Sequence, residues 1–120
     1  VDAREHFIYQ EGQAVFKWAV VKMAEATEEI LKRNNMTSQD ISYLLPHQAN
    51  MRIISATGKR LELENEKVLV NIEKYGNTTS ATIPMLMFEN QHKFKKGDNL
   101  ILTAFGAGFT WGAVLVKWAI

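Results

Sequence analysis

Apolar and polar positions along the chain follow helical spacing in some segments and strand-like runs in others. Between residues 13 and 35, one stripe recurs every three or four residues while charged side chains fall on the opposite side, which predicts a long amphipathic helix. The stripe consists of Phe16, Val20, Met23, Thr27 and Ile30, and the charged side of Lys22, Glu25, Glu29 and Lys32. The pair Asn34-Asn35 tolerates the left-handed turn that ends many helices.

The remaining segments alternate between strands and helices. "ISYLL" predicts a short buried strand that stops at Pro46, residues 48 to 62 predict a helix, and "KVLVNI" predicts a strand. "IPMLMFENQHKF" predicts a helix with Pro84 in its first turn or at a kink, and residues 100 to 105 and about 110 to 118 predict two strands. This order predicts an α/β fold, layered around a mixed, mostly parallel sheet of about four strands ending in an antiparallel pair.

Composition narrows the classes of protein. At 120 residues, with 47% hydrophobic and 22% charged, the chain is expected to form one domain over residues 1–120. A net charge of +1 predicts no overall attraction to nucleic acid or to a membrane. We expect a cytoplasmic protein, because no apolar run is long enough to span a membrane. The polar opening, which does not start with Met, suggests a chain that begins inside a larger protein.

Cysteine and histidine usage limits the chemistry. The chain has no cysteine, which excludes a disulfide framework, a thiolate metal site and a thiol nucleophile within it. The three histidines are scattered without a ligand pair at helical spacing, so we expect no metal site. We also expect no other cofactor.

Two polar residues stand where a predicted strand gives way to a helix. His47 follows "ISYLLP" and Asn77 follows "KVLVNIEKYG". Taken alone, each is more often a helix cap or a hydrogen-bonded turn residue than a catalytic group. However, ligands of α/β sheets gather at the carboxyl ends of strands, and two neutral donors there can converge on one oxyanion.

Two further patterns also have a structural and a functional interpretation. "FGAGFTWG" is a turn between two strands, and its glycines also let main-chain N–H groups approach a substrate. Arg52, Lys59 and Arg60 share one face of a predicted helix, with the small Ser55 and Ala56 between them. Most such faces are only solvated, but this one could receive an acidic partner.

Three motifs in order, "PHQANMRII", "YGNTTSATIP" and "AFGAGFTWGAVLV", resemble the C-terminal half of the β-ketoacyl-[acyl-carrier-protein] synthase III family, which are thiolase-fold condensing enzymes. The resemblance runs from about residue 11 to residue 120. It implies a fold of two similar α/β halves, of which this chain is the second. The first half, with its nucleophilic cysteine, is absent from the chain.

The resemblance also implies roles for individual residues. His47 and Asn77 fall on the catalytic histidine and asparagine, which stabilise the enolate formed when a malonyl thioester loses carbon dioxide. The main-chain N–H of Ala107, where many members carry glycine, falls in the acyl oxyanion hole, and Asn50 falls near the coenzyme A and pantetheine channel. The basic face of Arg52, Lys59 and Arg60 matches the helix that receives the acyl carrier protein.

The expected function is therefore the C-terminal portion of an acyltransferase that starts fatty-acid synthesis by condensing a short acyl-CoA with malonyl-carrier protein. Its expected partners are acyl carrier protein, acyl-CoA, the N-terminal half and a second subunit of a homodimer. We expect the chain alone to be inactive and to expose an apolar surface, with Ile53, Ile54, Met85 and Phe88 as candidates. The alternatives are a non-catalytic carrier- or CoA-binding module and a condensing enzyme of secondary metabolism.

Overall fold

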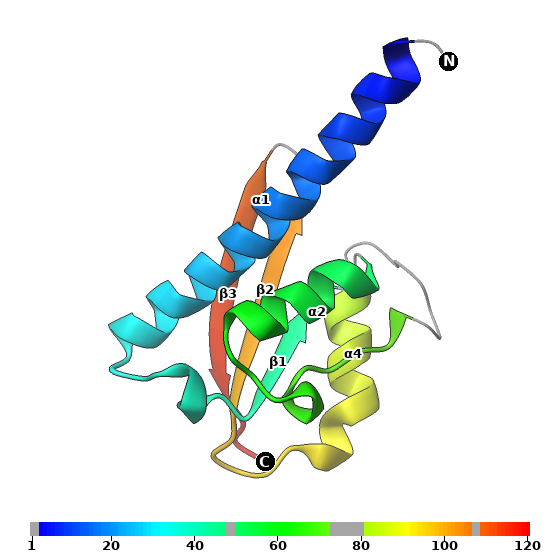
Figure 1. The fold of residues 1–120 in the computed structure, drawn as a ribbon. Coiled ribbons are helices and arrows are strands. Elements are labelled where there is room, and N and C mark those ends of the chain that lie inside the picture. The colour runs from blue at the N-terminus through cyan, green and yellow to red at the C-terminus, as the bar shows by residue number, and fades with distance from the viewer. Residues whose placement is uncertain (1–2, 48–49, 73–80, 107–108) are drawn as a thin grey trace.

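The computed structural model describes residues 3–47, 50–72, 81–106 and 109–120, with side chains from residue 13 onward. Its α-helices are α1 (Ala3–Arg33), α2 (Met51–Arg60) and α4 (Thr82–Asn90), and its strands are β1 (Tyr43–Pro46), β2 (Asn99–Gly106) and β3 (Thr110–Lys117). Short 3₁₀ turns occupy η1 (Ser38–Asp40), η2 (Asn65–Lys67) and η4 (Gln91–Lys93). In Figure 1 the long helix α1 crosses the sheet and extends beyond it at its N-terminal end.

The three strands form one mixed sheet in the order β1, β2, β3. β1 pairs in parallel with β2, and β2 pairs antiparallel with β3 through the hairpin that the glycine-rich stretch predicted. The prediction of an α/β fold with a mixed sheet ending in an antiparallel pair is confirmed. The described residues form three strands where about four were expected, and the antiparallel pairing is longer than the parallel one. The strand predicted for "KVLVNI" is wrong: Lys67 belongs to η2, and Val68 forms an isolated parallel bridge with Leu44 instead of a strand.

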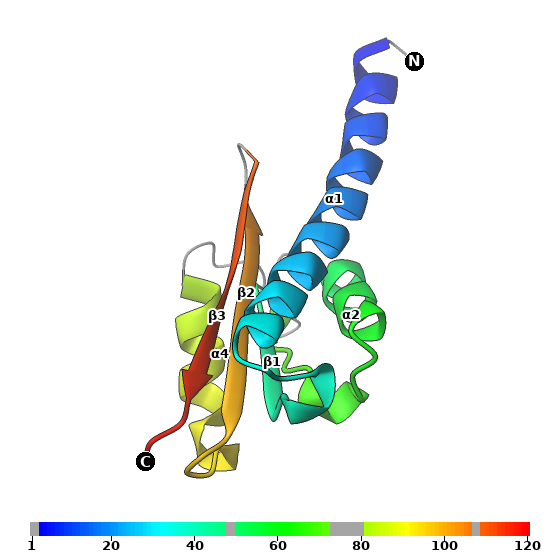
Figure 2. The ribbon, with the colours of Figure 1, turned by 90° about the vertical axis from the view of Figure 1, so that its left-hand side faces the viewer.

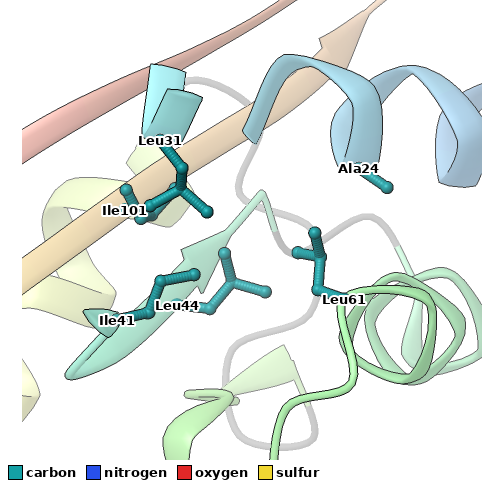
Figure 3. Packing of buried hydrophobic residues seen from close by; sticks show 6 residues of the cluster. All are labelled: Ala24, Leu31, Ile41, Leu44, Leu61 and Ile101. Carbon is teal, nitrogen blue, oxygen red and sulfur yellow. The ribbon is translucent and has the colours of Figure 1, made fainter. Parts of the chain in front are cut away.

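Helices cover both faces of the sheet. Figure 2 shows α1 and α2 on one side and α4 on the other. Successive side chains of a strand point to opposite faces, so Leu44 packs in the cluster on the α1 side while Leu45 packs in the cluster with Leu86 of α4. Figure 3 shows the first cluster, whose six buried members are Ala24, Leu31, Ile41, Leu44, Leu61 and Ile101.

The predicted stripe of α1 is confirmed where side chains are described. Val20, Met23 and Thr27 are buried. The helix starts earlier than the periodicity indicated, at Ala3, and ends as expected beside Asn35, whose φ of 55° is left-handed. The predicted helix with an early proline is also present, since Pro84 lies in the first turn of α4.

The expected set of exposed apolar residues is partly wrong. Ile53 and Ile54 are buried, because they form the inner side of α2 against α1 and the sheet. Phe88 is 75% exposed on α4, and Trp18 and Trp111 are also exposed. Within the described ranges, no helix combines the length and the apolar character needed to cross a membrane.

Candidate functional site

His47 lies directly after β1, at the carboxyl end of that strand. Its main-chain N–H donates to the carbonyl of Thr103 at 2.8 Å, which extends the β1–β2 pairing by one residue. The side chain is neither fully buried nor fully exposed. The structure thus places the imidazole at the edge of the sheet where the sequence predicted it.

The residue that caps α2 is Asn50, not His47. Asn50 has extended backbone angles, and its Oδ1 accepts a hydrogen bond from the Ile53 N–H at 2.9 Å. This bond satisfies one of the donors that the first turn of a helix leaves unpaired. The interpretation of His47 as the cap of α2 is therefore wrong.

One imidazole nitrogen of His47 has a partner on a different helix. Nδ1 lies 2.6 Å from the hydroxyl oxygen of Thr82, at the start of α4. Partial burial lowers the pKa of the imidazole below its ordinary value of 6.5, because desolvation penalises the charged form. The lowered pKa favours the uncharged imidazole at neutral pH, and that form has one N–H donor and one acceptor nitrogen.

The three basic residues are exposed at the two ends of α2. Arg52 lies in the first turn and Lys59 and Arg60 in the last, while the helix buries its opposite side. The guanidinium carbon of Arg52 lies 4.8 Å from the centre of the Phe16 ring on α1, so a cation–π contact orients this side chain. A cavity of about 250 Å³ opens beside the helix, with Met51, Ser55 and Lys59 among its lining residues.

Asn77 and Ala107 lie outside the described residues. Residues near each of these two positions are described. α4 has Ala81 at its N-cap position, and Gly106 pairs with Thr110 at the end of the hairpin.

A cluster of aromatic side chains lies at the hairpin between β2 and β3. The ring of Phe105 stacks on Trp111 with centroids 6.4 Å apart and contacts Phe109 at 5.3 Å. The ammonium group of Lys22 lies over both Trp18 and Trp111, at 4.8 and 5.2 Å. Neither this aromatic cluster nor the Thr82 contact was predicted from the sequence, although the three aromatic residues within "FGAGFTW" were a visible signal for the cluster.

Within the ranges that the structure covers, no three histidine, aspartate or glutamate side chains gather in a way that could hold a metal ion.

Comparison with known families gives one match over most of the chain. The profile described as "3-Oxoacyl-[acyl-carrier-protein (ACP)] synthase III C terminal" matches residues 31–118. A curated β-ketoacyl-[acyl-carrier-protein] synthase III from Porphyromonas gingivalis is 60% identical over 119 residues, which is 99% of this chain and 36% of that protein. A second from Bacteroides thetaiotaomicron is 55% identical over 118 residues, or 98% of this chain and 35% of the relative.

Solved structures give the same result for the fold. A 3-oxoacyl-[acyl-carrier-protein] synthase III from Aquifex aeolicus superposes with a TM-score of 0.87 at 45% identity, over 89% of this chain and 35% of that one. A priming β-ketosynthase from the R1128 polyketide pathway superposes with a TM-score of 0.76 at 31% identity, over 88% of this chain and 33% of that one. The chain spans about a third of the length of the relatives it matches.

Proposed function

The chain belongs to the 3-oxoacyl-[acyl-carrier-protein] synthase III family as its C-terminal part, and we propose that it supplies the enolate-stabilising side of a decarboxylative condensation site. The proposed reaction joins a short acyl group from acyl-CoA to malonyl-carrier protein. The single observation that carries the proposal is the position of His47, half-buried directly after the carboxyl end of β1 with its Nδ1 2.6 Å from the hydroxyl oxygen of Thr82.

The proposed role of His47 follows from the charge that develops in the reaction. When the malonyl thioester loses carbon dioxide, the electron pair of the broken carbon–carbon bond forms the double bond of an enolate, and the carbonyl π electrons move onto the thioester oxygen. A neutral N–H donor stabilises that oxygen by a hydrogen bond without transferring its proton. Asn77, which the resemblance assigns as the second donor, belongs to this proposal, as does the main-chain N–H of Ala107 at the acyl oxyanion hole.

The proposed carrier-protein surface is the basic face of α2. Arg52, Lys59 and Arg60 are exposed there, and an acidic carrier would be attracted to their combined charge. The neighbouring cavity, with Met51 on its wall, offers an apolar contact to the same partner. Asn50 stands at the start of this helix, between His47 and the basic face, so the proposed path of the pantetheine arm runs past it.

The proposed division of labour assigns the nucleophile to another part of the protein. The chain contains no cysteine, so the acyl-enzyme must form on a residue supplied by the N-terminal half that the longer relatives possess. We propose that the 120 residues alone do not catalyse condensation, and that the complete protein works as a cytoplasmic homodimer without a cofactor.

A condensing enzyme of secondary metabolism is the second candidate. The priming β-ketosynthase of a polyketide pathway shares the fold at 31% identity, against 45% for the Aquifex synthase III and 60% for the Porphyromonas one. The higher identities favour the fatty-acid function. The acyl donor that a complete protein prefers would distinguish the two.

The deciding experiment replaces His47 in a complete protein that carries this chain. His47→Ala is expected to lower malonyl decarboxylation by about two to three orders of magnitude, the usual effect of losing one oxyanion donor. Acylation of the nucleophile by acyl-CoA should stay within a few-fold of wild type, because His47 has no part in that step. His92→Ala, at an exposed position of η4, is the matched control. Wild-type decarboxylation by His47→Ala would refute the proposal.

A further inference from the structure

The hydroxyl of Thr82 is the described partner of the His47 imidazole, and it comes from an element 35 residues away in the sequence. Thr82 is the first residue of α4 and only 2% exposed, so bulk water does not reach its side chain. A buried hydroxyl proton needs an acceptor, because leaving a polar group unpaired away from water is costly. The question is which acceptor Thr82 uses.

Two other buried threonines show what this hydroxyl does inside a helix. Thr27 of α1 donates to the carbonyl of Met23, and Thr57 of α2 donates to the carbonyl of Ile53, both at 2.8 Å and four residues back. Thr82 is the first residue of α4, and its hydroxyl oxygen lies 2.6 Å from Nδ1 of His47. A hydroxyl that donates as those of Thr27 and Thr57 do would give its proton to this nitrogen.

We propose that Thr82 is a positioning residue whose hydroxyl donates to Nδ1 of His47 and thereby keeps the imidazole proton on Nε2. A neutral imidazole carries one proton, so a hydrogen bond accepted by Nδ1 leaves Nε2 as the N–H donor. The inference rests on the proposed function for its catalytic meaning. Its structural part, the tautomer of His47, can be tested without any turnover.

The proposed bond also fixes the orientation of the ring. The main-chain N–H of His47 is held by Thr103 on β2, and the side chain is held by Thr82 on α4. Because the main chain and Nδ1 of His47 both have partners, the ring is held in one orientation, in which Nδ1 and not Nε2 faces the Thr82 hydroxyl. The lowered pKa of the imidazole agrees with this arrangement, because only the uncharged ring accepts at Nδ1. A donor fixed in advance spares the reaction the cost of orienting it.

The first test reads the tautomer in the 120-residue chain labelled with ¹⁵N-histidine. Long-range ¹H–¹⁵N correlation distinguishes protonated from unprotonated ring nitrogens, and His47→Gln identifies the His47 signals among the three histidines. At pH 8 the wild type should show a protonated Nε2 and an unprotonated Nδ1. Thr82→Val keeps the shape and removes the hydroxyl, and its two nitrogen shifts should move toward each other as the tautomers mix. Thr82→Ser should retain the wild-type shifts.

The second test measures malonyl decarboxylation in the complete protein. Thr82→Val is expected to lower kcat about tenfold, the effect of one lost hydrogen bond, with KM little changed. Thr82→Ser should stay within about threefold of wild type, since it restores the donor. Thr27→Val removes a buried hydroxyl whose described hydrogen bond stays within α1, and it should leave kcat at the wild-type level. Thermal unfolding of each variant checks that it is folded.

The outcomes separate the inference from the proposed function. A wild-type His47 protonated on Nδ1 would overturn the inference, as would Thr82→Ser losing as much activity as Thr82→Val. An Nε2 proton that depends on Thr82, combined with full decarboxylation by His47→Ala, would leave the tautomer assignment standing and refute the proposed function.

Discussion

The partly buried imidazole of His47 predicts that acid destabilises this chain more than the same chain without the imidazole. The perturbation is a fall in pH from about 8 to about 5, through the ordinary histidine pKa of 6.5. The structure supplies one cause for a shifted pKa, which is burial, and burial lowers it. The folded chain therefore takes up the His47 proton at a lower pH than the unfolded chain does.

The sign and the size of the effect follow from proton linkage. Between the lowered pKa of the folded state and 6.5, the unfolded state binds more protons, so the free energy of unfolding falls as the pH falls. One proton sets an upper limit of about 1.4 kcal/mol per pH unit. Above pH 6.5 the contribution is constant, and below the folded pKa it levels off again. Where His47 is only partly protonated in the unfolded state, the free energy of unfolding changes less steeply with pH, so the measurement needs closely spaced pH values.

Urea unfolding of the wild type and of His47→Gln across this pH range is the assay. Subtracting the two curves removes the carboxylates and the other histidines, which both proteins share. The wild-type free energy of unfolding should fall relative to that of His47→Gln as the pH drops below 6.5. The difference in free energy of unfolding could instead stay constant, or the wild type could become relatively more stable in acid. Either result would show that the folded state does not disfavour the imidazolium ion and would contradict the prediction.

Two further predictions concern α2. Reversing Arg52 and Lys59 to glutamate in the complete protein should raise KM for malonyl-carrier protein about tenfold and KM for acyl-CoA much less, whereas the same change at the exposed Lys95 and Lys96 should alter neither. An equal rise in both KM values would contradict a carrier-specific surface. Asn50→Ala should lower the free energy of unfolding by about 1 kcal/mol through loss of the cap, and Asn50→Asp should retain it. Equal losses would exclude the cap as the cause.

Long periodic patterns allowed much of the fold to be predicted from the sequence. The stripe of α1, the early proline of α4 and the glycine-rich hairpin all lie where their residues indicated. These features depend on local spacing and turn chemistry, which one sequence displays directly. The prediction of a strand for "KVLVNI" was wrong because β-branched residues indicate only a local preference for extended backbone. Whether such a segment pairs with a neighbouring strand depends on the tertiary fold, and here only an isolated bridge from Val68 to Leu44 of β1 forms.

The sequence predicted where His47 lies, after a short strand and before a helix, but it did not predict the contacts of this residue. It also did not identify Asn50 as the cap of α2. The choice of cap depends on backbone angles set by the tertiary path, and Asn50 has the extended φ of −160° that capping requires. The Thr82 contact spans 35 positions, and no local pattern announces a pairing over that distance.

The structure also shows that the orientation of His47 is determined within this chain. Its main chain is bound by Thr103 of β2, and its ring by Thr82 of α4. Thr103 in turn donates its own hydroxyl toward the carbonyls of Met23 on α1 and Gly112 on β3, at 3.3 and 3.2 Å. The imidazole is thus connected to both faces of the sheet by groups that the 120 residues supply. In the proposed reaction, the enolate oxygen of the malonyl thioester would meet a donor that is already in place, which is the arrangement that electrostatic catalysis favours.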